Sequence, residues 1–465
     1  MPHGSFAEFA TKMQSAGVPD AAICAFQYNY ERLVAGHTGM IPEADIQPVE
    51  ELPRLEIVSR ERKPDPALLS QTVVIKLNGG LGTSMGLELA KSLLVVKDGL
   101  TFLDYIVKQV GYLRRKHEVP LRFLLMNSFV TSRDTLDFLR KYPELGDPCA
   151  LELMQSQAPK VDAATLRPVS WPQNPHLEWC PPGHGDFYPS LLGSGQLEGM
   201  LADGLNYAFI SNSDNLGASL DLSLLTYFAA SERPFLMEVA ERTPADRKGG
   251  HVARRDNVLL LRESAQCPET EQTAFQDVRR HRFFNTNNLW IRLDALRELL
   301  RAKGGFVPLP LIRNAKTVDP RDTNSPGVIQ LETAMGAAIE CFDQAGAIVV
   351  PRTRFTPVKT TADLFALRSD AYGVTDDWRI VLAKDNGQPP PALDLDVRHY
   401  KLVDQLDDKL GGGVPSLKEC QELIVRGPVC FNSKVRFRGK VTVTNACAES
   451  RNLAGGEYAD TTIAV

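Results

Sequence analysis

TVVIKLNGGLGTSMGLELAKS, residues 72–92, joins a strand-like apolar run directly to a glycine-rich turn. The β-branched residues at 73–75 are typical of a buried strand. Four glycines follow, namely Gly79, Gly80, Gly82 and Gly86. They lack side chains, so backbone N–H groups can approach a polyphosphate, and Lys91 comes shortly after them. The spacing matches neither a P-loop nor a dinucleotide fingerprint, so these residues alone leave a nucleotide loop and a structural turn both open.

Composition and charge are those of an ordinary globular protein. The 465 residues can bury a large core in two or three domains, and 43% of them are hydrophobic. A net charge of −5 without a long Lys/Arg block gives no reason to expect a nucleic-acid partner. No apolar stretch approaches the about 18 residues of a membrane span, and residues 1–14 do not have the pattern of a signal peptide. We therefore expect a cytoplasmic protein without a membrane partner.

The eight cysteines are scattered along the chain, and no two of them form a Cys-x-x-Cys pair. Zinc sites and disulfide frameworks need closer or more regular spacing. We therefore expect free thiols, most of them buried.

The chain divides by pattern into four parts. Residues 1–70 carry helical apolar spacing and then a proline-rich stretch, which predicts a helical N-terminal segment. In 71–370, strand-like runs such as RFLLM and YAFIS alternate with amphipathic patterns such as TFLDYIVKQVGYLRR. This alternation predicts an α/β domain with a mostly parallel sheet covered on both faces. Residues 371–414, which include KDNGQPPPALDLD, have the composition of a linker.

The last part, 415–465, has a six-residue period. Apolar or small residues recur at Leu423, Val429, Val435, Val441, Cys447 and Leu453. Such a period predicts a β-helix built from hexapeptide units, whereas the alternation in VRFRGKVTVTN would also suit an antiparallel hairpin. We favour the β-helix because the register persists over several coils. Its last coil would present an open surface, so we expect a homo-oligomer formed through it.

Asp214 ends the apolar run YAFISNSD, where ligands commonly bind at the carboxyl edge of an open α/β sheet. One carboxylate together with substrate phosphates and water is a common way to bind Mg2+. The same residues would also suit an Asp-Asn turn that merely ends a strand. The sequence at this position leaves both interpretations open.

Several sequence motifs resemble those of the eukaryotic-type UTP–glucose-1-phosphate uridylyltransferases, or UDP-glucose pyrophosphorylases. The motifs are LNGGLGTSMG, LLMNSF (124–129), QSQAP (155–159), PPGHGDFYPSLL (181–192), SNSDNLGA (211–218), KGG (248–250), FNTNNLW (284–290), QLETAMGAAI (330–339) and PVKTTADL (357–364). They span about 70–370 in the family's order. The chain departs from the family at Leu89 and Ala90, where Gly-Pro is more usual before the lysine.

The resemblance implies a fold and a set of site residues. The fold is a Rossmann-like nucleotidyltransferase (GT-A-like) mixed sheet with a helical N-terminal segment and a C-terminal left-handed β-helix. The implied catalytic residues are Lys91, Lys359 and Asp214, and Asp214 would also hold Mg2+. The implied nucleotide-binding residues are Leu77, Asn78, Gly79, Gly80, Met126, Gln155 and Gly183. The implied sugar-phosphate-binding residues are His184, Asn212, Gly250, Asn285 and Asn287.

These residue types suit the implied chemistry. An amide such as that of Gln155 can both donate to and accept from the edge of uracil. His184 has no partner at metal-ligand spacing and is interpreted as a hydrogen-bonding group, not a base. Lysine is a point charge that can follow a moving phosphate, although a single lysine is more often a solvated surface residue. The clustered asparagines could equally form a turn at a strand end.

The implied reaction is attack of a sugar 1-phosphate oxygen on the α-phosphorus of UTP, with release of pyrophosphate. Because this nucleophile is already anionic, alignment and neutralisation of charge suffice, and no enzyme nucleophile is needed. The main hypothesis is formation of UDP-glucose from UTP and glucose 1-phosphate. One alternative is a relative acting on N-acetylhexosamine 1-phosphate or several sugar phosphates, and another is a non-catalytic sugar-nucleotide-binding scaffold.

Overall fold

A large central sheet organises the protein, and the computed structural model describes residues 6–243, 246–383 and 390–465. The sheet has ten strands, with the main order β1-β12-β14-β10-β2-β5-β6; in addition, β11 pairs with β14 and β17, and β13 pairs with β12. Its strands are β1 (Gln47–Pro48), β2 (Thr72–Asn78), β5 (Arg122–Asn127), β6 (Glu152–Met154), β10 (Tyr207–Asn212), β11 (Phe235–Glu241), β12 (His251–Arg255), β13 (Val258–Arg262), β14 (Phe283–Arg292) and β17 (Gly346–Val349).

The direction of pairing is mixed. Strands β10, β2, β5 and β6 are parallel, as is the pair β11 and β17. The long β14 runs antiparallel to both β10 and β11, and the hairpin β12–β13 adds a further antiparallel pair. The mixed sheet implied by the resemblance is therefore confirmed, whereas strand–helix alternation alone predicted a more parallel one. The difference arises because β14 pairs along both of its edges.

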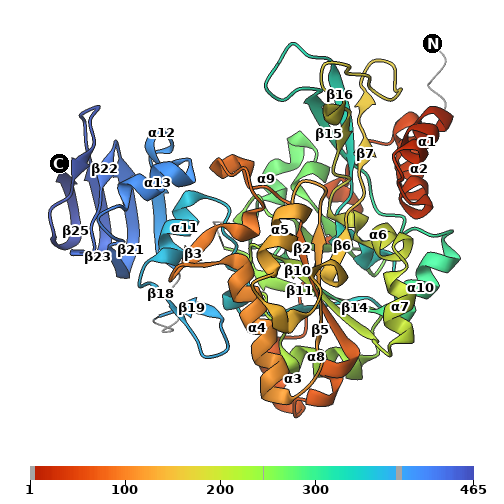
Figure 1. Ribbon diagram of the computed structural model, residues 1–465, viewed down its shortest axis with the longest axis horizontal. Helices are drawn as coiled ribbons and strands as arrows, with labels where there is room; N and C mark the ends of the chain where they lie inside the picture. Colours follow the sequence, from red (N-terminus) through yellow and green to blue (C-terminus); the bar gives the residue numbers. More distant parts are fainter. Residues whose placement is uncertain (1–5, 244–245, 384–389) are drawn as a thin grey trace.

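Helices cover both faces of this sheet (Figure 1). The α-helices described within residues 6–302 are α1 (Phe6–Ser15), α2 (Asp20–Val34), α3 (Leu55–Glu61), α4 (Phe102–His117), α5 (Ser132–Leu139), α6 (Phe187–Gly193), α7 (Gln196–Ala202), α8 (Leu222–Ser231), α9 (Gln272–Phe275) and α10 (Leu293–Ala302), of which α1 and α2 lie away from this sheet. Neighbouring residues of β2 enter different clusters, because Val74 packs with α4 and α8, whereas Val73 and Ile75 pack with α6, α7 and α10. The near-continuous apolar run of β2 follows from this burial on both faces.

The start of α4 shows how the sequence sets a helix boundary. Thr101 Oγ1 accepts a hydrogen bond from the N–H of Asp104, and the Asp104 carboxylate accepts one from the N–H of Thr101 in return. This capping box satisfies donors that the first turn cannot pair internally.

Shorter strands form small sheets around the main one. They are β3 (Val95–Lys97) with β4 (Leu100–Thr101), β7 (Ala158–Pro159) with β9 (Trp179–Cys180), β18 (Tyr372–Val374) with β19 (Ile380–Leu382), and the three-stranded set β8 (Val161–Asp162), β16 (Gly327–Glu332) and β15 (Ile312–Thr317). The first two helices form the expected N-terminal helical segment and pack beside this three-stranded sheet, where Phe9 and Tyr30 share a cluster with Leu331.

The C-terminal part contains a parallel sheet of four strands at one end of the molecule (Figure 1). Its strands are β20 (Ala392–Leu395), β21 (Ser416–Arg426), β23 (Val435–Thr444) and β25 (Gly456–Ala464), and the short β22 (Val429–Cys430) pairs in parallel with β24 (Arg451–Asn452). Leu423 lies opposite Val441 in this sheet, a separation of three hexapeptides. Parallel pairing excludes the antiparallel hairpin. The β-helix and its left hand remain a prediction.

The six-residue register is correct for most of its members but wrong at Cys447. Leu423, Val429, Val435 and Val441 are each at most 1% exposed, whereas Cys447 is exposed. It lies in the turn between β23 and β24, and the register resumes after this turn at Leu453, which is 1% exposed. All eight cysteines are free thiols, as expected, but only three of them are buried, namely Cys180, Cys267 and Cys420.

The interval 371–414, expected as a linker, carries several regular elements. These are β18, β19, β20, α12 (Val397–Tyr400) and α13 (Val403–Lys409), and α11 (Thr361–Arg368) precedes them. Part of the proline-rich stretch, residues 384–389, lies outside the described residues.

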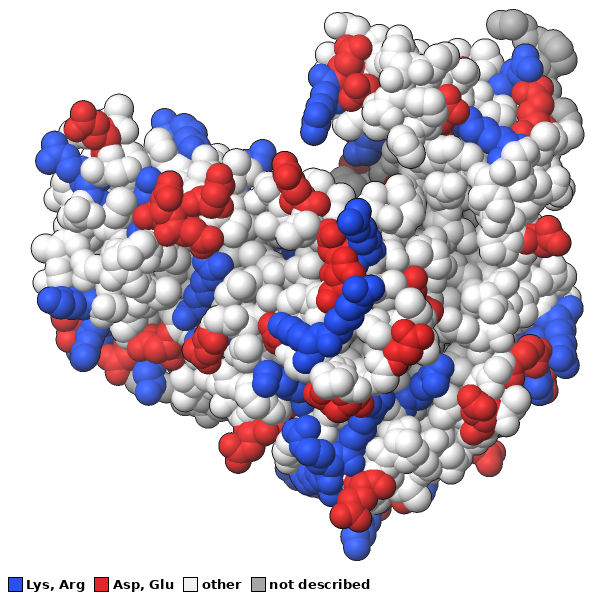
Figure 2. Space-filling model, in the orientation of Figure 1, with Lys and Arg blue, Asp and Glu red and all other residues white. Residues whose placement is uncertain are grey.

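Charged side chains of both signs are interspersed over the face seen in Figure 2 and are not gathered into one basic patch. None of the helices in the described part of the chain combines the length and apolar character that a membrane crossing requires.

The buried residues of the C-terminal register should differ from Cys447 in their effect on stability. Leu423→Ala removes a side chain that is 0% exposed, so we expect the free energy of unfolding to fall by about 2–5 kcal/mol. Cys447→Ala should change it by less than about 0.5 kcal/mol. Urea unfolding followed by fluorescence measures both. An equal loss in the two variants would contradict the assignment of Cys447 to the surface.

Candidate active site

The glycine loop leaves the carboxyl end of β2 and is closed by a backbone hydrogen bond. The N–H of Lys91 donates to the carbonyl oxygen of Gly80 at 3.0 Å. Gly82 and Gly86 have φ angles of 64° and 78°, a left-handed conformation that glycine adopts without a Cβ penalty. Leu89, one of the two positions at which the loop differs from the sequence usual in the family, is 55% exposed. The backbone of the loop thus sets the position of the lysine, while the unusual leucine faces solvent.

Lys91 and Asp214 form an ion pair, with 2.7 Å between Nζ and Oδ2. The parallel pairing of β10 with β2 explains their proximity, because the loops after both strands leave the same edge of the sheet. The two side chains remain 15% and 20% exposed, so the pair is accessible from solvent.

Asp214 could also hold a metal ion. Its second oxygen, Oδ1, is buried and has no hydrogen-bond partner among the described residues. In residues 6–243, 246–383 and 390–465, no three His, Cys, Asp or Glu side chains cluster as a ready-made metal site. A single free carboxylate oxygen fits Mg2+, which usually completes its coordination with substrate phosphates and water.

Asn78 serves a buried network at the ends of β2, β5 and β6. Its Nδ2 donates to Asn127 Oδ1 at 2.8 Å and to Thr135 Oγ1 at 3.0 Å. Asn127 in turn donates to Glu152 Oε1 at 2.7 Å. The side chain of Asn78, predicted to bind nucleotide, therefore joins the end of β2 to the end of β5 and to α5.

Gln155, Gly79 and Gly183 meet beside this network. The Nε2 of Gln155 donates to the carbonyl oxygen of Gly183 at 3.0 Å. A Cβ added to Gly79 would lie 2.7 Å from Gln155 Oε1, so a larger residue there would push the glutamine aside. Leu77 and Met126, paired on adjacent strands, lie in or against the core below. Their contact with a base stays a prediction.

His184 follows Gly183, whose φ of 79° and close approach to the backbone of Thr333 both require glycine. The Nδ1 of His184 accepts a hydrogen bond from the N–H of Met335 at 3.0 Å, so the proton of the neutral ring resides on Nε2. Burial lowers the pKa of His184 to about 4. The ring is therefore a neutral hydrogen-bond donor near pH 7, which agrees with its interpretation as a binding group.

The predicted sugar-binding residues form a connected row. Asn287 Nδ2 donates to Asn212 Oδ1 at 2.8 Å, and the Asn287 N–H donates to Asn285 Oδ1 at 2.8 Å. The Asn285 N–H in turn donates to the carbonyl oxygen of Gly250 at 3.0 Å. Asn287 has a left-handed φ of 60° and lies where the register of β14 against β11 shifts, between Asn285 and Asn288.

Glu263 joins this row, although sequence reasoning missed it. A Cβ on Gly250 would lie 2.4 Å from Glu263 Oε2, so the glycine makes room for the carboxylate. Burial raises the pKa of Glu263, and the charge of Lys359 opposes this. Glu263 directly follows β13, the second strand of the β12–β13 hairpin, and belongs to no recognisable motif. Only its position after a predicted strand could have indicated it.

Lys359 has an exposed side chain, and its backbone is fixed on both sides. The N–H of Val358 donates to the carbonyl oxygen of Asp214 at 3.2 Å, and the N–H of Lys359 donates to Asp363 Oδ2 at 2.9 Å. The structure thus brings all three predicted catalytic residues to one sheet edge.

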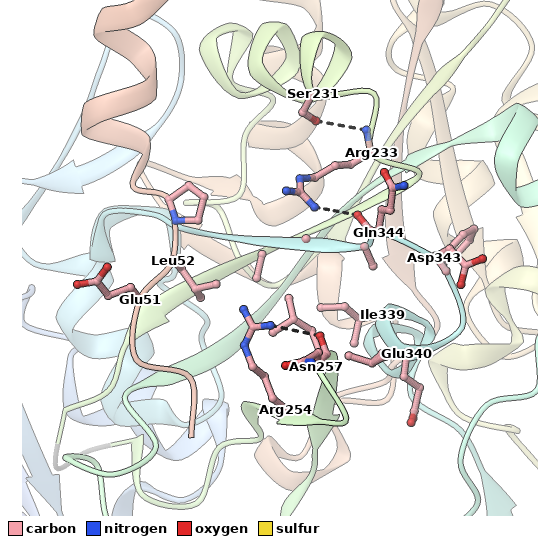
Figure 3. Close-up of a pocket in the computed structure, with 17 residues that line it drawn as sticks. Glu51, Leu52, Ser231, Arg233, Arg254, Asn257, Ile339, Glu340, Asp343 and Gln344 are labelled. Carbon is pink, nitrogen blue, oxygen red and sulfur yellow. Dashed lines mark hydrogen bonds between the residues drawn. The ribbon is translucent and has the colours of Figure 1, made fainter. Parts of the chain in front are cut away.

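A separate hollow lies at the opposite edge of the sheet. Its volume is about 540 Å3, and Figure 3 shows Arg233 and Arg254 among the residues around it. Arg233 precedes the amino end of β11, which runs parallel to β10, and Gly346, also at the hollow, is the first residue of β17. This part of the hollow therefore lies opposite the carboxyl strand ends that carry Asp214. It contains none of the predicted site residues.

Comparison with known proteins gives a consistent result. A family model described as UTP–glucose-1-phosphate uridylyltransferase matches residues 23–438. The enzyme of that name from Solanum tuberosum is 39% identical over 89% of this chain and 86% of its own length, and the one from Saccharomyces cerevisiae is 38% identical over 87% and 79%.

Solved structures agree over the full length. A mutant UDP-glucose pyrophosphorylase from Leishmania major, in complex with UDP-glucose, is 48% identical with a TM-score of 0.94, covering 99% of both chains. A structure described as UDP-glucose phosphorylase from Trypanosoma brucei is 47% identical with a TM-score of 0.91, covering 99% of this chain and 100% of that one.

Asp186, next to His184, should make stability depend on pH. Burial raises the pKa of its carboxyl group to about 7, although Ser190 and Ser156 donate to it. Because the folded state holds this proton more tightly than the unfolded state, stability should fall as pH rises from about 4 to 7. Asp186→Asn removes the titration, so its melting temperature relative to wild type should be higher at pH 8 than at pH 5. The same difference at both pH values would contradict the buried acid.

Proposed function

We propose that this chain, which belongs to the UTP–glucose-1-phosphate uridylyltransferase family, forms UDP-glucose and pyrophosphate from UTP and glucose 1-phosphate. The observation that carries the proposal is the Lys91–Asp214 pair, held where the glycine loop meets the end of β10. A glycine loop can bind a polyphosphate through its backbone, and the pair places one cation and one metal-binding oxygen beside it. The relatives in complex with UDP-glucose support the same assignment.

The reaction is an in-line displacement at the α-phosphorus. A phosphate oxygen of glucose 1-phosphate attacks, the bond to the β-phosphate bridging oxygen breaks, and pyrophosphate leaves with the electron pair. Lys91 neutralises charge on the transferring α-phosphoryl group, and Lys359 binds the sugar phosphate. The nucleophile is anionic at neutral pH, so the proposal assigns no serine, cysteine or general base.

Asp214 would hold Mg2+ through its free Oδ1 while Oδ2 stays on Lys91. Bound there with phosphate oxygens and water, Mg2+ supplies positive charge that offsets the phosphates and helps to order them.

The remaining residues recognise the base and the sugar. Leu77, Met126 and Gln155 would frame uracil, together with the backbone at Asn78, Gly79, Gly80 and Gly183. His184 would donate from Nε2 to phosphate or sugar. The sugar hydroxyls would meet Asn212, Asn285, Asn287 and the backbone of Gly250, with Glu263 as an additional acceptor beside them.

A substrate panel tests the function. Purified protein is incubated with UTP, Mg2+ and glucose, galactose or N-acetylglucosamine 1-phosphate, and release of pyrophosphate is measured. We expect release with glucose 1-phosphate. Preference for the acetylated sugar would support the alternative substrate class, and no release with any sugar phosphate would support a binding scaffold.

The finer architecture is also a proposal. We assign residues 1–70 to the helical N-terminal segment, 71–370 to a GT-A-like catalytic domain, 371–414 to the connection and 415–465 to a left-handed β-helix. The parallel pairing and the Leu423–Val441 spacing support stacked coils. The cytoplasmic location stays a prediction from the sequence.

Self-association through the β-helix follows from its last strand. β25 pairs with β23 along one edge, and most of its residues are exposed or half-buried. An unpaired strand edge can pair with another chain. We expect light scattering to give a multiple of the 51.3 kDa chain mass, and a strictly monomeric mass would contradict this role.

Asp214→Asn keeps the size of the side chain but removes its negative charge. We expect turnover to fall by about 100-fold or more, because the metal loses its protein ligand. The exposed Asp203→Asn in the same measurement is the control and should retain activity. Near-normal turnover of the Asp214 variant with Mg2+ would remove this residue from the site.

Lys91→Ala should lower kcat more than it raises the KM for UTP, because the lysine meets charge that develops in the transition state. Steady-state kinetics separate the two parameters, with the exposed Lys316→Ala as the matched control. A rise in KM alone would indicate that Lys91 only binds UTP.

A further inference from the structure

The two catalytic side chains Asp214 and Lys359 come from different loops that lie against each other. One loop follows β10 and the other follows β17. Asn215 and Pro357 form a β-bridge between them, and the Val358 N–H donates to the carbonyl oxygen of Asp214. The relative position of the metal-binding carboxylate and the phosphate-binding lysine therefore depends on how these loops are joined.

The side chain of Asn215 bridges the loops with both ends of its amide. Its Nδ2 donates to the carbonyl oxygen of Arg354 at 3.2 Å, and its Oδ1 accepts from the N–H of Thr356 at 3.0 Å. The residue is 2% exposed, so water cannot readily replace either bond. One amide thus satisfies two backbone groups of the loop that ends at Lys359.

A buried ion pair holds the same loop from behind. The guanidinium of Arg354 donates from Nε and Nη2 to both oxygens of Glu238, at 2.8 and 2.7 Å. Its Nη2 also donates to the carbonyl oxygen of Ser219, in the loop after β10, at 3.0 Å. Trp290 and Asn288 donate to the same carboxylate at 2.9 and 3.1 Å.

This carboxylate is firmly anchored in the sheet. Glu238 belongs to β11 and is 0% exposed, and its donors Asn288 and Trp290 belong to β14. A bidentate pair whose carboxylate accepts two further hydrogen bonds imposes one geometry on both partners.

We infer that Asn215 is a positioning residue, which with the buried Glu238–Arg354 pair sets the place of Lys359 relative to Asp214. None of these three residues needs to touch substrate. They act by fixing the backbone on either side of Phe355, so that Lys359 meets the sugar phosphate while Asp214 faces the α-phosphate. This inference rests on the proposed function.

Asn215→Ala tests the inference, because it removes both bonds and buries no charge. We expect kcat to fall by about 10–100-fold and the KM for glucose 1-phosphate to rise, as misplacement of about 1 Å commonly has this effect. The KM for UTP should change by less than about threefold, because UTP lacks the sugar phosphate. Asn206→Ala alters an exposed asparagine directly before the same strand and should leave all three values unchanged.

A double-mutant cycle separates positioning from a general loss of stability. If Asn215 acts through Lys359, adding Asn215→Ala to Lys359→Ala should lower kcat by less than about threefold further. Equilibrium binding of UDP-glucose in the presence of a chelator gives a second readout, and the two single variants and the double variant should all weaken it to a similar degree. Full multiplication of the two effects would overturn the positioning role.

Failure of this inference can be told apart from failure of the proposed function. If wild-type protein makes no UDP-glucose, the proposed function is wrong. If wild type is active and Asn215→Ala keeps wild-type kcat and KM, the positioning role alone is wrong. Should Asn215→Ala not fold, Asn215→Asp keeps the size and the acceptor toward Thr356. For this variant too we expect a lower kcat, a higher KM for glucose 1-phosphate and a nearly unchanged KM for UTP. Unchanged kinetics would overturn the inference.

Discussion

The parallel pairing of β10 with β2 is the constraint on which the rest of the site depends. Their register places Asn212 opposite Leu77, so the two strands end together and the chain must turn twice at one sheet edge. One turn is the glycine loop, closed from Gly80 to Lys91, and the other carries Asp214. The ion pair between them follows from this pairing, whereas β17's loop reaches the same edge because β17 pairs in parallel with β11. A shift of one residue in this register would separate the charges and exchange the two apolar clusters into which the side chains of β2 pack.

The ionisable side chains buried below this edge of the sheet are mostly neutral or paired with an opposite charge. Burial lowers the pKa of Lys76, on β2 below the site, to about 7, and its Nζ donates to Ser211 Oγ at 2.7 Å. Arg354, which lies near Lys76, is charged, and its guanidinium forms a bidentate ion pair with the Glu238 carboxylate. Since an unpaired buried charge is costly, these cations are neutralised or paired, whereas Lys91 and Lys359 remain accessible from solvent. Phosphate groups would therefore bind at these two positively charged lysines, because the charges buried below them are already paired or neutral.

The sequence was informative where chemistry requires a recognisable pattern. The strand and glycine loop, Lys91, Asp214 and the two asparagines of β14 were all identified, and the structure brings them to one edge. The parallel strands of the tail followed from the period of six, although Cys447 lies outside the core because it belongs to the turn between β23 and β24. Residues that act through tertiary contacts were missed. Glu263, Asn215 and the Glu238–Arg354 pair are ordinary in sequence, and their roles arise from strands and loops that meet only after folding. Asn78 shows the converse, because a residue in the most specific motif has its side chain bound within the protein.

The stereochemistry at the α-phosphorus tests the central claim most directly, namely that this site aligns two substrates for one in-line displacement without an enzyme nucleophile. The substrate would be UTP with a single chiral sulfur substitution at the α-phosphate, and the configuration of the resulting UDP-glucose analogue would be determined by phosphorus NMR. One displacement inverts the configuration, and the Lys91–Asp214 geometry predicts inversion. Retention would mean two successive displacements through a covalent enzyme intermediate and would contradict the account.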